Sequence, residues 1–284
     1  MYFKKYKNML FLIFCISLLG CSSSISFIPA PAPAFDTTIV KNEIFTVSKH
    51  FDDTSKTWYY LTRIKHEDGA GNLVKLNLAL TDESKLMGEK ASDFAKRMDA
   101  QLVFNASMST VVSTSSGEEK RIPVGIQIID GKIMQERSTN RYTLGIKDNN
   151  ELVVYPSGTT AQEILDDGIN TALTAFVPLI EDHKVVTEAL DDVANLSVKN
   201  PRQVIAQFDN LDILFLTCGG RDHGGTGMTA QDMVRVLKKL DVKFAYNLDG
   251  GGSISTVVNG DFINWKIDGH GTEERPRANF LYVK

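Results

Sequence analysis

Two glycine-rich segments in the second half of the sequence hold most of the residues suited to chemistry. Eight of the 21 glycines lie between Gly219 and Gly252. The first segment, 218–228, stands between a predicted strand and a predicted helix, where glycine lets backbone N–H groups approach a ligand closely. A helix N-terminus adds unpaired donors and a partial positive charge. With Arg221 beside it, the segment predicts a cradle for phosphate or carboxylate; the alternative is a flexible connection.

In the second glycine-rich segment, 247–253, Asp249 is followed directly by three consecutive glycines. The apolar run Phe244-Ala245-Tyr246 predicts a strand that ends shortly before Asp249, and a second strand follows the glycines. A plain turn needs only one or two glycines. Three of them, flanked by Asp249 and Ser253, indicate a backbone packed against a ligand. A loose hairpin loop is the alternative.

These segments belong to a series of motifs in a fixed order. The series is Arg202, Gly220-Arg221, Gly227-Met228-Thr229, Asn247 to Ser253, and Arg275-Pro276. From about residue 200 to the end, this order resembles the phosphodiester glycosidase family. A looser likeness in the first half covers Phe104-Asn105, Pro123-Val124-Gly125 and Asp130-Gly131.

The resemblance implies hydrolysis of a sugar-1-phosphodiester at the anomeric carbon, which releases free sugar and a phosphomonoester. Phosphate is already a good leaving group, so the site needs less general-acid help than an ordinary glycosidase. It needs cations on the phosphate, and the planar fork of arginine suits phosphate better than lysine does. It also needs a carboxylate near the anomeric carbon, to activate water or stabilise an oxocarbenium-like centre.

These needs assign roles to the matching residues. Asp249 is the expected catalytic carboxylate, and Arg202 and Arg221 are the expected catalytic cations. The expected substrate-binding residues are Asn105, Thr229, Asn247, Gly250, Gly251, Ser253 and Arg275. Structural alternatives stay open: Arg202 could pair with Asp249, and Thr229 could serve only as a helix N-cap. Asp249 could instead satisfy turn amides, and Arg275 could lie on a solvated loop.

Departures from the family pattern keep a second function open. Ala106 and Ser107 follow Asn105 where the family has glycines, and Gly219 stands where it usually has an acid. They favour, as the alternative, a non-catalytic lipoprotein that binds glycans or phosphoglycans on the same fold.

A divalent metal stays open, since Asp222, Asp249 and phosphate could hold one. Clustered metal-site spacing of His, Asp and Glu is absent from the sequence, so no cofactor and no required metal are predicted. Cys218 ends an apolar strand and is expected to be a buried thiol.

These residues must be positioned by strands and helices. The pattern of strand and helix signals predicts an α+β fold, with a large mixed or antiparallel β-sheet core and two or three helices. Strand signals dominate, without regular alternation of strand and helix. Residues 38–284 are expected to form one phosphodiester glycosidase-like domain. Helices are predicted at 83–98, 160–165 and 229–240, the last opened by a capping-box pattern. Hairpins are predicted around 68–72, 130–131, 148–150, 209–210 and 259–260.

The N-terminus has the pattern of a secretory signal. Three lysines precede an apolar run, 9–19, that is too short to span a bilayer, for which about 20 residues are needed. The sequence Leu-Leu-Gly-Cys at 18–21 resembles the lipobox of bacterial lipoproteins. This resemblance implies removal of residues 1–20 and lipidation of Cys21; an ordinary signal peptide is the alternative. Ser, Pro and Ala in 21–37 predict an extended linker.

Charge and composition limit the expected partners. The net charge of −4 comes without a basic stripe, which excludes a typical nucleic-acid-binding protein. The expected partners are a phosphoglycan or sugar-1-phosphodiester substrate, and a bacterial membrane reached through the lipid on Cys21. The expected location is the cell envelope, with the body outside the cytoplasm.

Overall fold

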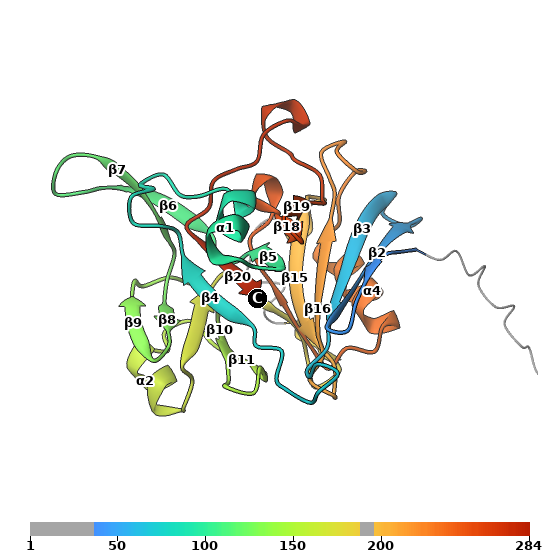
Figure 1. Ribbon diagram of the computed structural model, residues 1–284, viewed down its shortest axis with the longest axis horizontal. Coiled ribbons are helices and arrows are strands. Elements are labelled where there is room, and N and C mark those ends of the chain that lie inside the picture. The colour runs from blue at the N-terminus through green and yellow to red at the C-terminus, as the bar shows by residue number, and fades with distance from the viewer. Residues whose placement is uncertain (1–36, 188–195) are drawn as a thin grey trace, which may run out of the picture. The chain divides into compact units, whose positions relative to one another are not determined.

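An antiparallel sheet of eight strands is the largest element of the structure, a computed structural model that describes residues 37–187 and 196–284 (Figure 1). Its strand β16 is apolar along almost its whole length and buried throughout, as suits a strand packed on both faces. The spatial order is β1 (Thr38–Lys41), β2 (Phe45–Asp52), β3 (Thr57–Ile64), β16 (Ile213–Cys218), β15 (Arg202–Gln207), β17 (Phe244–Asn247), β13 (Pro178–Glu181) and β14 (Lys184–Val185).

Two sheets of five strands and one hairpin complete the β-structure. One sheet has the order β19 (Asp261–Phe262), β18 (Thr256–Val258), β5 (Leu102–Asn105), β20 (Asn279–Val283) and β4 (Asn77–Leu80). The other has the order β11 (Leu152–Tyr155), β10 (Thr143–Ile146), β12 (Thr171–Thr174), β8 (Gln127–Ile129) and β9 (Lys132–Gln135). The hairpin consists of β6 (Ser109–Ser113) and β7 (Glu119–Pro123), and it projects at the upper left of Figure 1.

The three large sheets share one apolar core. Phe104 of β5 stacks on Phe215 of β16, with ring centroids 3.6 Å apart, and Leu144 of β10 lies in the same cluster. The buried hydroxyl of Tyr246 in β17 donates to the carbonyl of Tyr142 at 2.7 Å, just before β10. Because close-packed interiors transmit displacements, this core fixes the three sheets relative to one another.

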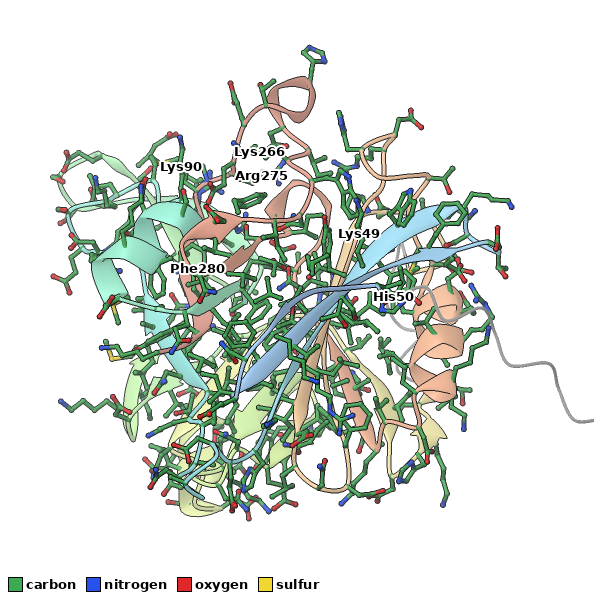
Figure 2. All side chains as sticks on the ribbon, turned by 45° about the vertical axis from the view of Figure 1, so that its right-hand side comes forward. Lys49, His50, Lys90, Lys266, Arg275 and Phe280 are labelled. Carbon is green, nitrogen blue, oxygen red and sulfur yellow. The ribbon has the colours of Figure 1, made fainter. Side chains whose placement is uncertain are left out.

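A helix covers the other face of each sheet. On the eight-stranded sheet, α4 begins with a capping box in which Thr229 and Asp232 each accept from the other's backbone N–H. On the β5–β20 sheet, Phe94 of α1 packs against Phe280, with ring centroids 4.5 Å apart; Phe280 is labelled in Figure 2. No helix of the described residues is long and apolar enough to cross a membrane. The helices are α1 (Ala91–Met98), α2 (Ala161–Asp166) and α4 (Ala230–Lys239).

Most elements predicted from the sequence are confirmed. The fold is α+β with a large antiparallel core, and four predicted hairpins occur as β8–β9, β10–β11, β15–β16 and β18–β19. In the first of these, Asp130 and Gly131 have φ values of 48° and 72°, the mirror-image turn geometry that suits a two-residue hairpin. The predicted helices at 160–165 and 229–240 correspond to α2 and α4.

Two predictions about the first half are wrong. The hairpin predicted around 68–72 does not form, because β3 pairs with β2 and β16 whereas β4 pairs with β20. The helix predicted at 83–98 begins only at Ala91, since Gly88 has a φ of 90° and Glu89 forms an antiparallel bridge with Arg277. The predicted signal peptide, Cys21 and all but the last residue of the linker lie outside the described residues.

Candidate functional site

One cavity of about 230 Å³ collects five of the predicted site residues where β15 begins and β17 ends. The two strands are antiparallel neighbours, with Val204 opposite Asn247, so the residues before β15 and after β17 meet at one edge. We call this space the arginine cavity. The predicted residues that line it are Arg202, Arg221, Asp249, Gly250 and Gly251. Met108, Arg141, Phe176 and Asn200 complete its wall.

The carboxylate of Asp249 is held from two directions. Its Oδ2 accepts from Arg277 at 2.5 Å, and its Oδ1 accepts from the backbone N–H of Gly250 at 2.9 Å. The Nδ2 of Asn105 donates to the backbone carbonyl of Asp249 at 2.8 Å. The Asp249 side chain is 13% exposed and lines the cavity, together with its donor Gly250, whereas Arg277 lies outside the cavity wall.

Arg277 is a buried partner that the sequence interpretation missed. Its side chain is 3% exposed, and burial lowers the pKa of the guanidinium, while the charge of Asp249 opposes that shift. Its Nη2 also donates to the carbonyl of Ser107 at 3.3 Å, and its Nε has no partner among the described residues. Such a guanidinium stays charged in a protein, so it can fix the orientation of Asp249. In the sequence, the only indication of a role for Arg277 was its position two residues after Arg275, which belongs to a family motif.

Arg202 lies at the wall of the cavity with its guanidinium largely buried. It is 5% exposed, and burial lowers its pKa. Its Nη2 donates to the carbonyl of Val198 at 2.9 Å, and its Nε donates to the carbonyl of Met228 at 3.3 Å. Arg202 is the first residue of β15, and these bonds hold its charged side chain at the cavity wall.

Arg221 approaches the cavity from the first glycine-rich segment. It is exposed, has a φ of 54°, and donates from Nη2 to the Oδ1 of Asn200 at 3.3 Å. The backbone of Gly251 lies against this guanidinium: a Cβ there would be 3.2 Å from Nη2. A Cβ on Gly250 would be 2.7 Å from the carbonyl oxygen of Pro201. The glycines after Asp249 are therefore required by close approach of other groups.

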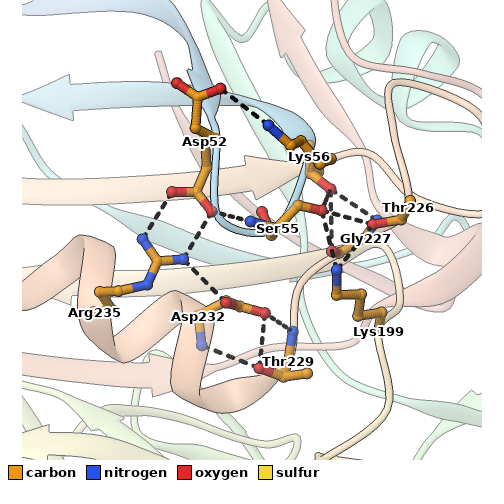
Figure 3. A network of polar contacts seen from close by, with 11 residues as sticks. Asp52, Ser55, Lys56, Lys199, Thr226, Gly227, Thr229, Asp232 and Arg235 are labelled. Atoms are coloured by element: carbon orange, nitrogen blue, oxygen red, sulfur yellow. Dashed lines mark hydrogen bonds and ion pairs between the residues drawn. The ribbon is translucent and has the colours of Figure 1, made fainter.

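A polar network holds the first glycine-rich segment in place (Figure 3). The carboxylate of Asp52 pairs with both Nη atoms of Arg235 in α4 at 2.7 Å, and this pair holds the pKa of Asp52 well below its usual range. The Thr57 hydroxyl donates to the carbonyl of Gly227 and accepts from its N–H. The Thr226 hydroxyl donates to the carbonyl of Ser55. The turn between β2 and β3 thus ties down the segment that carries the catalytic candidate Arg221.

Arg275 does not line the arginine cavity. It lies in the loop before β20 (Figure 2) and forms a bidentate pair with Asp268, from Nε at 2.5 Å and from Nη2 at 2.7 Å. The hydrogen bond to Asp268 raises the pKa of the guanidinium. Its Nη2 lies so close to Gly252 that a Cβ there would clash. The structure thus gives Arg275 a carboxylate partner in place of the expected phosphate.

The other predicted substrate-binding side chains are parts of the framework. Asn105 is fully buried and accepts from the N–H of Ser255 at 2.8 Å. Thr229 is engaged in the α4 capping box. Ser253 is 2% exposed, and Asn247 is fully buried and donates to the carbonyl of Leu248. None of these four residues lines the arginine cavity.

The departures from the family motifs have local reasons. Ala106 and Ser107 are both buried, so neither narrows the cavity; Met108 is the residue of this segment that lines it. A Cβ on Gly219 would clash with the backbone of His223, which leaves no room there for the expected acid. Among residues 37–187 and 196–284, no group of three or more His, Cys, Asp or Glu could hold a metal ion. Cys218 is fully buried, and burial raises the pKa of its thiol to about 12.

Arg141 is the other functional candidate that the sequence interpretation missed. Its guanidinium lies 5.0 Å from the centre of the Phe176 ring, a cation–π contact at the cavity wall. Arg141 precedes β10, and Phe176 follows β12. Tyr246 holds both segments, because its hydroxyl donates to the carbonyl of Tyr142 and accepts from the N–H of Ala175. No sequence motif surrounds Arg141, and only the packing of the sheets brings it to Asp249.

The phosphodiester glycosidase family matches residues 98–284, a range that contains every residue of the arginine cavity. The chain belongs to this family. A curated relative, the SPbeta prophage-derived uncharacterized protein YomE of Bacillus subtilis, is 28% identical over 253 residues. That match covers 82% of this chain but only 39% of YomE. This chain therefore spans well under half the length of that family relative.

Two solved structures share the fold of this phosphodiester glycosidase domain. The zebrafish N-acetylglucosamine-1-phosphodiester alpha-N-acetylglucosaminidase catalytic domain, auto-inhibited by its pro-peptide, superposes with a TM-score of 0.66 at 17% identity. The superposition covers 87% of this chain and 85% of that chain. A hypothetical protein from Synechocystis gives a TM-score of 0.56 at 13% identity, over 87% of this chain and 63% of that chain. At these identities the likeness concerns the fold.

Proposed function

We propose that the protein hydrolyses sugar-1-phosphodiesters at the anomeric carbon, on cell-surface or exogenous glycans. The observation that carries the proposal is the arginine cavity, which Asp249, Arg202 and Arg221 line together with Gly250 and Gly251. Guanidinium forks bind phosphate oxygens in pairs. Asp249 and the arginines belong to one family domain, which makes a phosphorylated sugar the ligand that best fits them.

The chemistry divides between the cations and the carboxylate. Arg202 and Arg221 bind the phosphate and stabilise the charge that it gains as the bond from its oxygen to the anomeric carbon breaks. Asp249 takes the proton from a water whose oxygen attacks that carbon, and it stabilises the oxocarbenium-like centre. The products are free sugar and a phosphomonoester, and the proton on Asp249 returns to solvent. Arg277 acts through Asp249 and is a positioning residue.

Release of sugar from an N-acetylglucosamine-1-phosphodiester tests the proposal. We expect turnover between pH 5 and 8, and a loss of about hundredfold or more in kcat for Asp249→Asn, in the range of general acid–base catalysis. Asp222→Asn is the matched control, because Asp222 is an exposed acid outside the cavity wall. Water labelled with oxygen-18 should place the label in the sugar; label in the phosphate would mean attack at phosphorus. No release across several aglycones would overturn the proposal.

A non-catalytic glycan-binding protein is the second candidate. Glycosidases commonly use two carboxylates, and Asp249 is the only carboxylate of the described residues that lines the cavity. This candidate predicts binding of phosphoglycans without product. Calorimetry on the wild-type protein that shows binding, together with no sugar release over a day, would favour it over hydrolysis.

We also propose attachment to a bacterial membrane through lipid on Cys21, on the strength of the lipobox-like sequence at 18–21. The full chain expressed in bacteria with labelled palmitate should carry label and partition into detergent. Cys21→Ser should lose both properties. Equal partitioning of the two proteins would contradict the anchor and leave the hydrolase proposal untouched.

A further inference from the structure

A second cavity of about 330 Å³ adjoins the arginine cavity, and Arg141 lines both. Its walls come from the β9–β10 connection, residues 136–142, and from the turn before α2, residues 156–160. We call it the β9–β10 cavity. Its size falls at the lower end of small-molecule sites, which span roughly 300–1,000 Å³.

The β9–β10 cavity is held in shape by bonds within its walls. Glu136 accepts from the N–H of Ala161 at 2.9 Å, which joins the connection to the first turn of α2. The hydroxyl of Ser157 donates to the carbonyl of Thr139 at 2.8 Å and joins the two walls directly. A ligand would therefore meet walls already in place, which lowers the entropy lost on binding.

The polar groups of this cavity favour an anion. Arg137 and Arg141 line it, and its single acid, Glu136, already accepts the Ala161 amide. None of the arginine ion pairs in the described parts of the chain involves Arg137, Arg141 or Arg221. Arg137 and Arg141 thus line the cavity without a carboxylate ion-pair partner among the described residues, and guanidinium is the side chain best suited to phosphate and carboxylate.

The rest of the lining argues against other occupants. No described aromatic side chain lines the β9–β10 cavity, so a nucleobase would find no ring to stack on. Ile126 and Pro156 are its main apolar residues beside several hydroxyl groups, which is a poor match for a lipid chain. Hydroxyl and guanidinium groups together suit a sugar that carries a negative charge.

The charge balance of the two cavities points the same way. A phosphodiester carries one negative charge, and the departing phosphomonoester carries about 1.5 to 2. Arg202 and Arg221 match that demand. Arg141, which lines both cavities, and Arg137, which lines only the β9–β10 cavity, can therefore bind a second anionic group.

We infer that the β9–β10 cavity is a subsite for a second anionic group, one unit away from the scissile phosphodiester. The inference rests on the proposed hydrolase function and narrows its substrate to a polyanionic glycan. Such a glycan either repeats its phosphodiester or bears a carboxylate on the neighbouring unit.

Binding of analogues that cannot be hydrolysed tests the subsite apart from turnover. In these, a CH₂ group replaces the bridging oxygen at the anomeric carbon. One analogue has a single phosphonate ester with a neutral sugar behind it. A second has a phosphodiester on that neighbouring sugar, and a third has a carboxylate there. We expect the better of the two dianionic analogues to bind about tenfold more tightly than the monoanionic one, a modest value for a charge-assisted bond.

Variants of Arg137 locate the effect. Arg137→Gln should reduce the tenfold preference to near unity, and Arg137→Lys should restore part of it. Lys184→Gln is the matched control, since it removes an exposed positive charge that lines neither cavity. Equal binding of all three analogues by the wild-type protein would overturn the subsite, and so would a preference that survives in Arg137→Gln. A preference that Arg137→Gln removes, found in a protein that hydrolyses no substrate, would uphold the subsite and reject the hydrolase.

Discussion

Replacing Arg277 with methionine tests whether the buried ion pair prepares Asp249 for catalysis. Arg277 and Asp249 are 3% and 13% exposed, and they lie 2.5 Å apart. Breaking a buried pair by removing one partner costs about 3–5 kcal/mol. Asp249 borders a cavity, where solvent reaches part of its charge, so we expect about 3 kcal/mol.

The same change should reduce turnover more than binding. Asp249 keeps the bond from Gly250 at 2.9 Å, but loses the donor that holds its second oxygen. A displacement of about 1 Å at a catalytic group can cost about 100-fold in rate. We therefore expect kcat for the N-acetylglucosamine-1-phosphodiester to fall by about that factor, with KM little changed.

Denaturant unfolding and steady-state kinetics measure both effects, and two further variants isolate the pair. Arg275→Met is the matched control for stability, because its pair with Asp268 is 35% and 30% exposed and should contribute about 1 kcal/mol or less. Arg277→Met combined with Asp249→Asn should recover part of the lost stability, since no unpaired charge is then buried. Arg277→Lys keeps a charge if the methionine variant folds poorly. An Arg277→Met enzyme with wild-type kcat, or one no less stable than Arg275→Met, would refute the reasoning.

Three other predictions follow from buried groups. Asp52→Asn should lower the free energy of unfolding by about 3 kcal/mol at pH 7. Because Arg235 lowers the pKa of Asp52, the stability gap between variant and wild type should shrink as pH falls below about 4. Gly252→Ala should lower stability by about 1–3 kcal/mol in urea unfolding, because its Cβ would displace Arg275; an unchanged midpoint would contradict that clash. Cys218 should react with thiol reagents only in denaturant, since it is fully buried and its thiol pKa is about 12; rapid native labelling would count against this.

The local signals in the sequence were sufficient where one short segment decides the outcome. Asp130-Gly131 fixes its own hairpin through backbone preference, and the 229–232 pattern fixes the start of α4. The hairpin predicted around 68–72 would have paired β3 with β4, and that pairing is wrong. Alternation of apolar residues shows which face is buried, whereas the pairing of β3 with β16 depends on the packing of distant segments.

The candidate site shows the same division. The glycine-rich segments around Arg221 and Asp249 were visible because close approach demands a residue type at fixed positions. Arg141 and Arg277 carry no such local mark. An arginine in a polar stretch looks the same whether it meets solvent or a carboxylate, and only burial against another sheet decides which.

The position of the site explains why its parts come from all three sheets. Arg202 and Asp249 are delivered by the eight-stranded sheet, Arg141 precedes β10, and Arg277 precedes β20. Tyr246 joins two of these sheets, because its buried hydroxyl accepts from Ala175 and donates to Tyr142. A loss of packing between the sheets would therefore separate Arg141 and Arg277 from Asp249 before it unfolded any strand. Activity in this protein should thus be more sensitive than secondary structure to substitutions in the shared core, and Tyr246 is the residue at which that difference should be largest.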